Sequence, residues 1–277
     1  MQMEIIYQDQ DIVVINKPAG LVVNKSETVK GETVQSWFES QMIEWDKVKD
    51  ISSWSSLIPD EFDPSYGEPE TIFQVRGGVV HRLDKQTSGV LVLAKNPGSL
   101  INLMVQFKLR QTEKQYLALT HGLIDPSEGT INAPLKRHFR QRQKIAVDAS
   151  GRQALTWYQV KQYYQFRLDK LALLKLKPNQ LKKLITTTGK FSLVKAQPKT
   201  GRMHQIRVHL AHIGHPLVAD DKYVGRKRYK LDKLWCPRHF LHASWLKLMH
   251  PRTHQEVSFE ARLSDDLNQA LNYLMLE

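Results

Sequence analysis

The chain has 277 residues, enough to bury a sizeable core in one large domain or two small ones. Its composition is that of an ordinary globular protein, and its single cysteine excludes an internal disulfide and a cysteine-based zinc site. The 40 Lys and Arg residues outnumber the 28 Asp and Glu residues. The resulting net charge of +12 favours a polyanionic partner such as nucleic acid, although a basic protein without such a partner stays open on charge alone.

The N-terminus and the apolar runs predict a cytoplasmic protein. The chain turns acidic at Glu4 and lacks the basic and then apolar pattern of a signal peptide. No apolar run approaches the roughly 20 residues that span a bilayer, and no long basic amphipathic helix favours a membrane surface. Since a chain without disulfides suits a reducing compartment, we expect the cytoplasm and no membrane partner.

The first third of the chain predicts a strand pair, a helix and a long loop. Residues 5–7 and 12–15 are short apolar runs around a polar turn, which is typical of paired strands. A helix is expected over residues 32–42. The polar, proline-containing segment that follows predicts a long exposed loop insertion at about residues 45–77, and loops of this length are functional or disordered.

Further along, helices and strands alternate without a regular order. Asn96 is the expected cap of a helix that opens at Pro97, and a strand is expected over residues 114–119. Short β-rich segments continue as far as Val160. Because strands in mixed order with few helices indicate the α+β class, we expect that class here.

The last part of the chain predicts one amphipathic helix, a strand pair and a closing helix. Apolar side chains at helical spacing mark a helix over residues 203–213, with Thr200 as a plausible cap. Strands are expected around residues 243–248 and 257–259, and a short helix from about Asp265 ends the chain.

Residues 78–90 are the most informative segment. They place Asp84 between cationic side chains and a Thr-Ser-Gly turn, with apolar residues before and after. A carboxylate on a short loop between buried runs is well placed for chemistry. Taken alone, an aspartate beside an arginine is more often a surface ion pair.

The string HRLDKQTSG, residues 81–89, resembles the catalytic loop of the RluA-type family of RNA pseudouridine synthases, which reads His-Arg-Leu-Asp-x-x-Thr-Ser-Gly. Other blocks are similar to those of the same family and occur in the same order: residues 7–20, 114–116, 201–210, 214–216, 241–243 and 250–251. The resemblance implies one catalytic domain over residues 1–277, with a mixed, mostly antiparallel sheet, flanking helices and a central basic cleft. We expect no N-terminal S4 domain.

The resemblance also implies roles for individual residues. Asp84 would be the reacting carboxylate, Arg207 the cation that keeps it charged and oriented, and Tyr116 the ring that stacks on uracil and can handle a proton. For RNA binding it implies Arg82 beside the vacated base stack, Arg202 on phosphate and Leu241 in the uracil pocket. Where the family often has Gly-Asp before a later Tyr-Gly, this chain reads ADDKYVG over residues 219–225.

Two basic runs mix cations with aromatic side chains, at residues 136–144 and 226–230. Either run can be a solvated face. In a protein of this charge with the motifs above we favour contact with RNA phosphates, by Arg137, Arg140 and Lys144, with base stacking by Phe139.

No cofactor or metal is expected, because the implied isomerisation consumes none and no dinucleotide or P-loop motif occurs. His81 and His204 are predicted to be structural hydrogen-bonding groups. The expected partner is structured RNA, ribosomal or transfer, and not DNA, and we expect a monomer. An RNA-binding or ribosome-assembly factor with dispensable isomerase activity is the alternative, while a metal-dependent nuclease is disfavoured.

Overall fold

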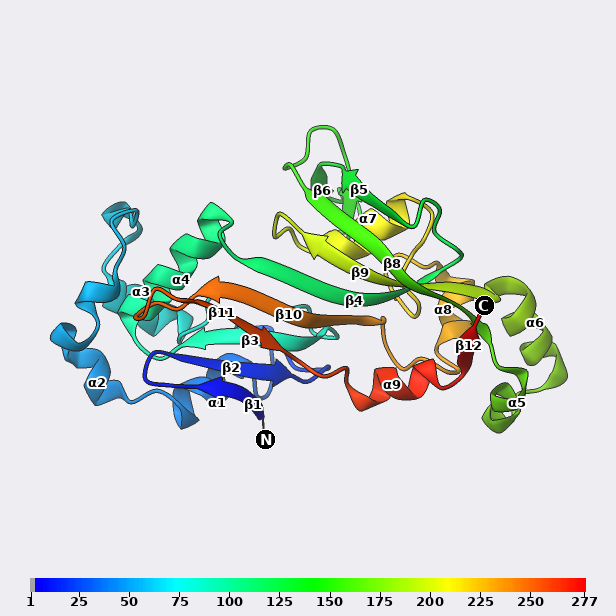
Figure 1. Ribbon diagram of the computed structural model, residues 1–277, viewed down its shortest axis with the longest axis horizontal. Helices are drawn as coiled ribbons and strands as arrows, with labels where there is room; N and C mark the ends of the chain where they lie inside the picture. Colours follow the sequence, from blue (N-terminus) through cyan, green and yellow to red (C-terminus); the bar gives the residue numbers. More distant parts are fainter. Residues whose placement is uncertain (1–2) are drawn as a thin grey trace. The chain divides into compact units, whose positions relative to one another are not determined.

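The structure, a computed structural model, describes residues 3–277 and divides into two compact units. The first unit combines the chain up to Lys114 with Ala243–Arg262, and the second combines Gln115–His242 with Leu263–Glu277. Figure 1 shows the ribbon in sequence colours. The expected single catalytic domain and its central basic cleft stay predictions.

The first unit is built on strands in the order β1-β2-β3-β10, with β11 paired to β10, and the pairs β1–β2, β2–β3 and β10–β11 are antiparallel. Their bounds are β1 (Glu4–Gln8), β2 (Ile12–Lys17), β3 (Ser88–Ala94), β10 (Leu241–Met249) and β11 (Glu256–Glu260), and the first two residues of β10 are assigned to the second unit. Every residue of β3 is buried, which makes it the central strand of this unit. The predicted strand pairs near the two ends of the chain are confirmed.

Helices α1 (Val34–Gln41) and α4 (Pro97–Leu109) belong to the same unit. The helix predicted over residues 32–42 is α1, which begins at Val34, and α4 begins at Pro97 as predicted. The side chain of Asn96 accepts a hydrogen bond of 2.8 Å from the backbone N–H of Ser99, so the predicted cap of α4 is confirmed. Thr33 caps α1 in the same way.

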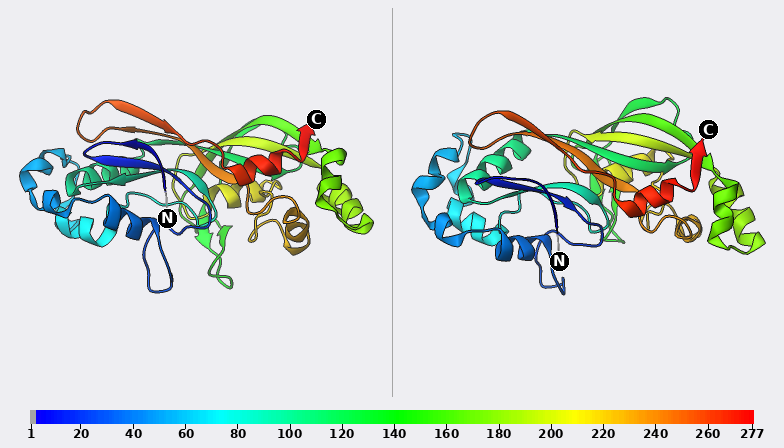
Figure 2. Two further views of the ribbon diagram at one scale, coloured as in Figure 1. Left: turned by 90° about the horizontal axis from the view of Figure 1, so that it is seen from below. Right: turned by 60° about the horizontal axis from the view of Figure 1, so that its bottom comes forward.

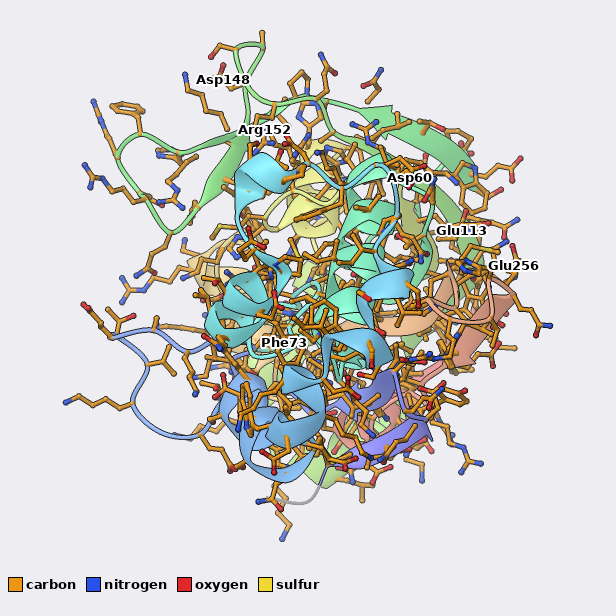
Figure 3. The ribbon with its side chains drawn as sticks, turned by 90° about the vertical axis from the view of Figure 1, so that its left-hand side faces the viewer. Asp60, Phe73, Glu113, Asp148, Arg152 and Glu256 are labelled. Atoms are coloured by element: carbon orange, nitrogen blue, oxygen red, sulfur yellow. The ribbon has the colours of Figure 1, made fainter. Side chains whose placement is uncertain are left out.

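The segment after α1 differs from the long exposed loop that the sequence predicts. It folds into short helices: α2 (Trp45–Lys49), η1 (Ile51–Ser53), η2 (Ser55–Leu57), η3 (Pro64–Tyr66) and α3 (Pro69–Arg76). Trp54 is 1% exposed, and its indole N–H donates to the carbonyl of Val48 at 2.9 Å. Phe73 is fully buried, and Figure 3 shows it among these helices. Burial of these two aromatic side chains orders a segment that has no regular apolar period.

The second unit has its own antiparallel strands, in the order β4-β9-β8-β12, with β5 on β8. They are β4 (Glu113–His121), β5 (Glu128–Asn132), β8 (Leu155–Phe166), β9 (Lys190–Pro198) and β12 (Leu274–Leu276). A separate hairpin joins β6 (Leu135–Arg137) to β7 (Ile145–Val147). The left view of Figure 2 shows it as a green hairpin that projects.

The helices of the second unit are α5 (Leu168–Leu171), α6 (Pro178–Thr188), α7 (Gln205–His212), α8 (Arg226–Asp232) and α9 (Asp265–Leu271), with the turn η4 (Ala172–Leu174). The predicted cap of α7 is wrong, because His204 holds that position. The Thr200 hydroxyl instead accepts from the N–H of Leu155 and donates to the Gln205 side chain.

Mixed elements, antiparallel pairing and flanking helices confirm the predicted α+β class. Among residues 3–277, we find no helix with the length and apolar character needed to cross a membrane.

Candidate functional site

Asp84 lies on a short loop that leads directly into the buried strand β3, as the sequence predicts. The backbone N–H of Thr87 donates to the carbonyl of Asp84 at 3.0 Å and closes a turn. Asp84 is partly buried and Arg82 is exposed. Before the loop, Val79 forms only an isolated bridge to Leu93, so the preceding residues do not form a strand. The loop is thus anchored firmly at the β3 end.

The end of β2 supports this loop from the side. The N–H of Gly20 donates to the carbonyl of Lys85 at 2.8 Å. Lys17 is fully buried, and its ammonium group donates to the carbonyls of Pro18, Leu21 and Lys85 at 2.7, 3.0 and 3.4 Å. Sequence reasoning missed Lys17, although a lysine that ends an apolar strand was the available signal.

His81 has the structural role that the sequence predicts. Its Nε2 accepts a 3.2 Å hydrogen bond from the backbone N–H of Val92. The imidazole stacks on Phe107, with ring centroids 4.6 Å apart, and the ammonium of Lys114 lies 5.2 Å from the same Phe107 ring. Burial, aided by the charge of Lys114, lowers the pKa of His81 to about 3. The ring is therefore a neutral acceptor near neutral pH.

Tyr116 and Leu241 pack into one apolar cluster of the second unit. Tyr116 lies on β4, opposite Ala196 of β9, and is partly buried, while Leu241 is 4% exposed. Ile206 and Leu210 of α7 belong to the same cluster. The structure therefore brings two predicted site residues together with the helix that carries the third, Arg207.

Arg207 is buried, and Asp220 holds one edge of its guanidinium. Its Nε and Nη2 atoms donate to the two carboxylate oxygens of Asp220, each at 2.8 Å, and Nη2 lies 3.2 Å from Asp221 Oδ1. Its guanidinium carbon also lies 5.3 Å from the centre of the Tyr223 ring. Sequence reasoning missed Asp220 as a partner, although the ADDKYVG segment was the place to look.

His204 contacts the Tyr223 hydroxyl through Nδ1 at 2.9 Å, so its predicted structural role is confirmed. Arg202 is partly buried, and its Nε donates to the carbonyl of Gln153 at 3.2 Å. Asp84 and Arg82 belong to the first unit, whereas Tyr116 and Arg207 belong to the second. Their joint action stays a prediction.

The loop between β6 and β7 is cationic and carries an exposed aromatic ring. Phe139 is 80% exposed, with the guanidinium of Arg140 5.0 Å from its ring centre. Arg137 and Arg140 are exposed, and Lys144 is partly exposed. The second basic run forms α8, on which Arg226 is exposed. Both runs present cations to solvent, as binding to a polyanion requires.

Within the described part of the chain, one grouping has the geometry of a possible metal site, formed by Asp9, Asp11 and His250. Side chains of the protein already contact the carboxylate oxygens of this grouping. Arg252 donates to both oxygens of Asp11 at 2.6 and 2.8 Å, Asn96 donates to Asp11 at 3.0 Å, and His250 Nε2 lies 2.7 Å from Asp9. A cation would have to displace the guanidinium, so we interpret the grouping as an ion-pair network.

Comparison with known proteins places these features in a family. Residues 11–212 match the family described as RNA pseudouridylate synthase. Over 282 residues the chain is 34% identical to ribosomal large subunit pseudouridine synthase D of Pseudomonas aeruginosa, covering 99% of this chain and 72% of that protein. Over 275 residues it is 32% identical to tRNA pseudouridine synthase C of Haemophilus ducreyi, covering 98% and 96%.

Among solved structures, human RNA Pseudouridylate Synthase Domain Containing 1 has a similar fold. The TM-score is 0.64 at 22% identity, over 97% of this chain and 87% of that one. At this identity the likeness shows the fold alone, and it agrees with the mixed α+β architecture.

Proposed function

This chain belongs to the RNA pseudouridylate synthase family and is an RNA pseudouridine synthase, and from that premise we propose that it isomerises specific uridines in structured ribosomal or transfer RNA. The observation that carries the proposal is the family match over residues 11–212, which includes the Asp84 loop and all of α7. The relatives named for ribosomal and transfer RNA support both substrate classes. These findings support the enzyme and not the alternative of a binding factor with dispensable activity.

The reaction moves one bond within the nucleotide. The bond between uracil N1 and ribose breaks, the base turns and C5 joins the same ribose carbon. C5 then loses its proton and N1 takes one up, so that the product is an isomer of the substrate. We assign the ionised carboxylate of Asp84 to the ribose, where it either attacks the anomeric carbon or removes a proton from the neighbouring carbon. Both routes require the charged form, and a cation beside a carboxylate favours that form.

Arg207 is the cation that we assign to Asp84. A guanidinium stays charged at any working pH and offers donors in a fixed plane, which suits it to orient a carboxylate. Tyr116 and Leu241 supply the apolar surface for uracil, because both belong to one cluster of the second unit. The Tyr116 phenol can act as an acid or a base toward the C5 proton.

A uridine in folded RNA must leave its stack before it can react, at an expense of a few kcal/mol in a paired region. Arg82 is exposed two residues before Asp84, and we assign it to the vacated stack. Arg202 is assigned to phosphate. The β6–β7 loop, with Arg137, Arg140 and Lys144, is assigned to the RNA backbone, where cations bind without regard to sequence.

Asp84→Asn tests the assignment of the reacting group. The substitution keeps the size of the side chain and removes the charge, so we expect RNA affinity to persist and pseudouridine formation to fall by at least about 10⁴-fold. The measurement is single-turnover formation of pseudouridine in transcribed transfer RNA and ribosomal RNA fragments.

Asp60→Asn is the matched control, because Asp60 is an exposed aspartate of the same unit. It should keep the parental rate. Turnover by the Asp84 variant near that of the control would refute the assignment. Mapping pseudouridines in cellular RNA with and without the gene would identify the substrate.

A further inference from the structure

The Arg207–Asp220 pair is buried on both sides, with 4% of the arginine side chain and none of the aspartate side chain exposed. Asp220 uses both oxygens on the Nε–Nη2 edge of the guanidinium, each at 2.8 Å. Its Oδ1 also accepts the backbone N–H groups of Lys222 and Tyr223, at 2.9 and 3.3 Å. The carboxylate is therefore fixed by its own turn while it holds the arginine.

A hydrogen bond to a neighbouring helix holds the turn that leads into Asp220. Ala219 has φ of +56°, a left-handed conformation that is unfavourable for a residue with a Cβ. Its N–H donates to Asp232 Oδ2 at 2.9 Å, and the same oxygen lies 2.9 Å from His121 Nε2. Asp232 is fully buried at the end of α8. Two elements, β4 and α8, thus stabilise a strained turn whose next residue contacts Arg207.

A buried ion pair contributes little net stability, because the desolvation of two charges offsets most of their attraction. Strain and buried charge concentrated beside one arginine point instead to a need for that arginine in one orientation. Asp221 cannot meet this need, because its carboxylate is 48% exposed, touches Arg207 once at 3.2 Å and is shared with Lys222 at 3.3 Å.

We propose that Asp220 is a positioning residue for the isomerisation. It fixes one edge of the Arg207 guanidinium, and the five N–H donors of that group leave others to orient the reacting carboxylate. Asp220 itself touches neither RNA nor the reacting atoms. The inference rests on the proposed role of Arg207 at Asp84.

A double-mutant cycle tests the proposal, with Asp220→Ala, Arg207→Ala and the double variant, and with Asp221→Ala as the matched control. The readouts are the single-turnover rate at saturating transfer RNA transcript and the Kd for the same RNA. We expect Asp220→Ala to slow the reaction by about 100-fold, as a misplaced catalytic group does, with Kd changed by less than about threefold. Asp221→Ala should keep the parental rate.

The cycle also shows whether Asp220 acts through Arg207. If it does, the double variant reacts at the rate of Arg207→Ala, since no oriented guanidinium remains to lose. A double variant at least about tenfold slower than Arg207→Ala would overturn the proposal, as would Asp220→Ala at the parental rate. An Arg207→Ala variant at the parental rate would instead refute the assigned role of Arg207 itself.

Thermal unfolding of each variant shows whether a slower reaction comes from loss of the fold. Removing one member of a buried pair destabilises strongly, whereas removing both leaves no unpaired charge. If Asp220→Ala does not fold, Asp220→Asn replaces it, because this variant keeps the volume and one acceptor oxygen. A folded Asp220→Asn at the parental rate overturns the proposal, and a slowed rate with unchanged Kd supports it.

Discussion

At the scale of single residues, His81 shows how the loop of Asp84 depends on a neutral side chain. Its Nε2 must stay unprotonated to accept the N–H of Val92. In the unfolded chain its pKa returns to the ordinary value near 6.5, whereas burial and the Lys114 charge hold it at about 3 in the folded protein. Between these values the unfolded state binds a proton that the folded state does not. Stability must therefore fall as the pH falls below 6.5.

The fall in stability below pH 6.5 can be measured. At one pH unit below 6.5 the His81 contribution should lower the free energy of unfolding by about 1.4 kcal/mol. Urea unfolding at pH 7.5 and 5.5 would measure it. The His81→Gln variant keeps an acceptor that does not titrate. The fall in its free energy of unfolding between the two pH values should therefore be smaller than that of the parent by the same amount. A His81→Gln variant that loses as much stability as the parent between the two pH values would refute this role of His81.

Contiguous motifs were easier to predict than contacts between distant residues. Asp84 and Arg207 stand in strings that resemble the family, so their sequence positions were sufficient to select them. Lys17 and Asp220 were missed, because what they bind comes from elsewhere in the chain: the carbonyl of Lys85 and the guanidinium of Arg207. A sequence shows residue types, but not which side chains the fold buries together.

At the scale of elements, the same limit explains the error over residues 45–77. Each helix there has three to eight residues, too short to display an amphipathic period. The order comes from tertiary burial of Trp54 and Phe73. The strands and longer helices were predicted because their apolar pattern and caps are local features. The Thr200 cap was wrong because the hydroxyl binds Leu155 and Gln205 instead.

Gly89 links the loop of Asp84 to β10 and tests how tightly the two pack. It has φ of +115°, and a Cβ there would lie 2.1 Å from the carbonyl oxygen of Ala243. Gly89→Ala should therefore lower the free energy of unfolding by more than about 3 kcal/mol, through strain and displacement of β10 together. Chemical denaturation would measure the loss.

Gly20→Ala is the matched control, because Gly20 also has a positive φ, of +86°, but no atom lies within 4 Å of the added carbon. The free energy of unfolding of Gly20→Ala should fall only by the strain of the left-handed conformation, about 1–2 kcal/mol. Equal losses in the two variants would show that β10 does not press on Gly89.

At the scale of the whole molecule, charge is distributed unevenly along the chain. Residues 44–70 contain eight acidic and two basic side chains, whereas residues 136–144 contain five basic and no acidic ones. The acidic segment belongs to the first unit and the basic loop to the second. Since phosphates are repelled by one and attracted by the other, the net charge of +12 understates the field at the basic loop.

Replacing Arg137, Arg140 and Lys144 together with Ala should weaken binding to many RNA sequences alike. Each phosphate contact that is lost should reduce the slope of log K against log salt by about one unit. The single-turnover rate at saturating RNA should change little, because these residues lie outside the reacting set. Binding isotherms over a range of salt concentrations would measure the slope.

The matched control replaces Lys30, Lys47 and Lys49 with Ala. It lowers the net charge by the same amount as the first triple variant. All three are exposed, and the last two pair with Glu44 and Asp46 in the acidic segment. Their loss should leave the slope unchanged, since no phosphate is expected there. If both triple variants shift the slope alike, only the total charge matters. If neither does, the β6–β7 loop faces solvent and the RNA binds through other cations, with α8 the next surface to test.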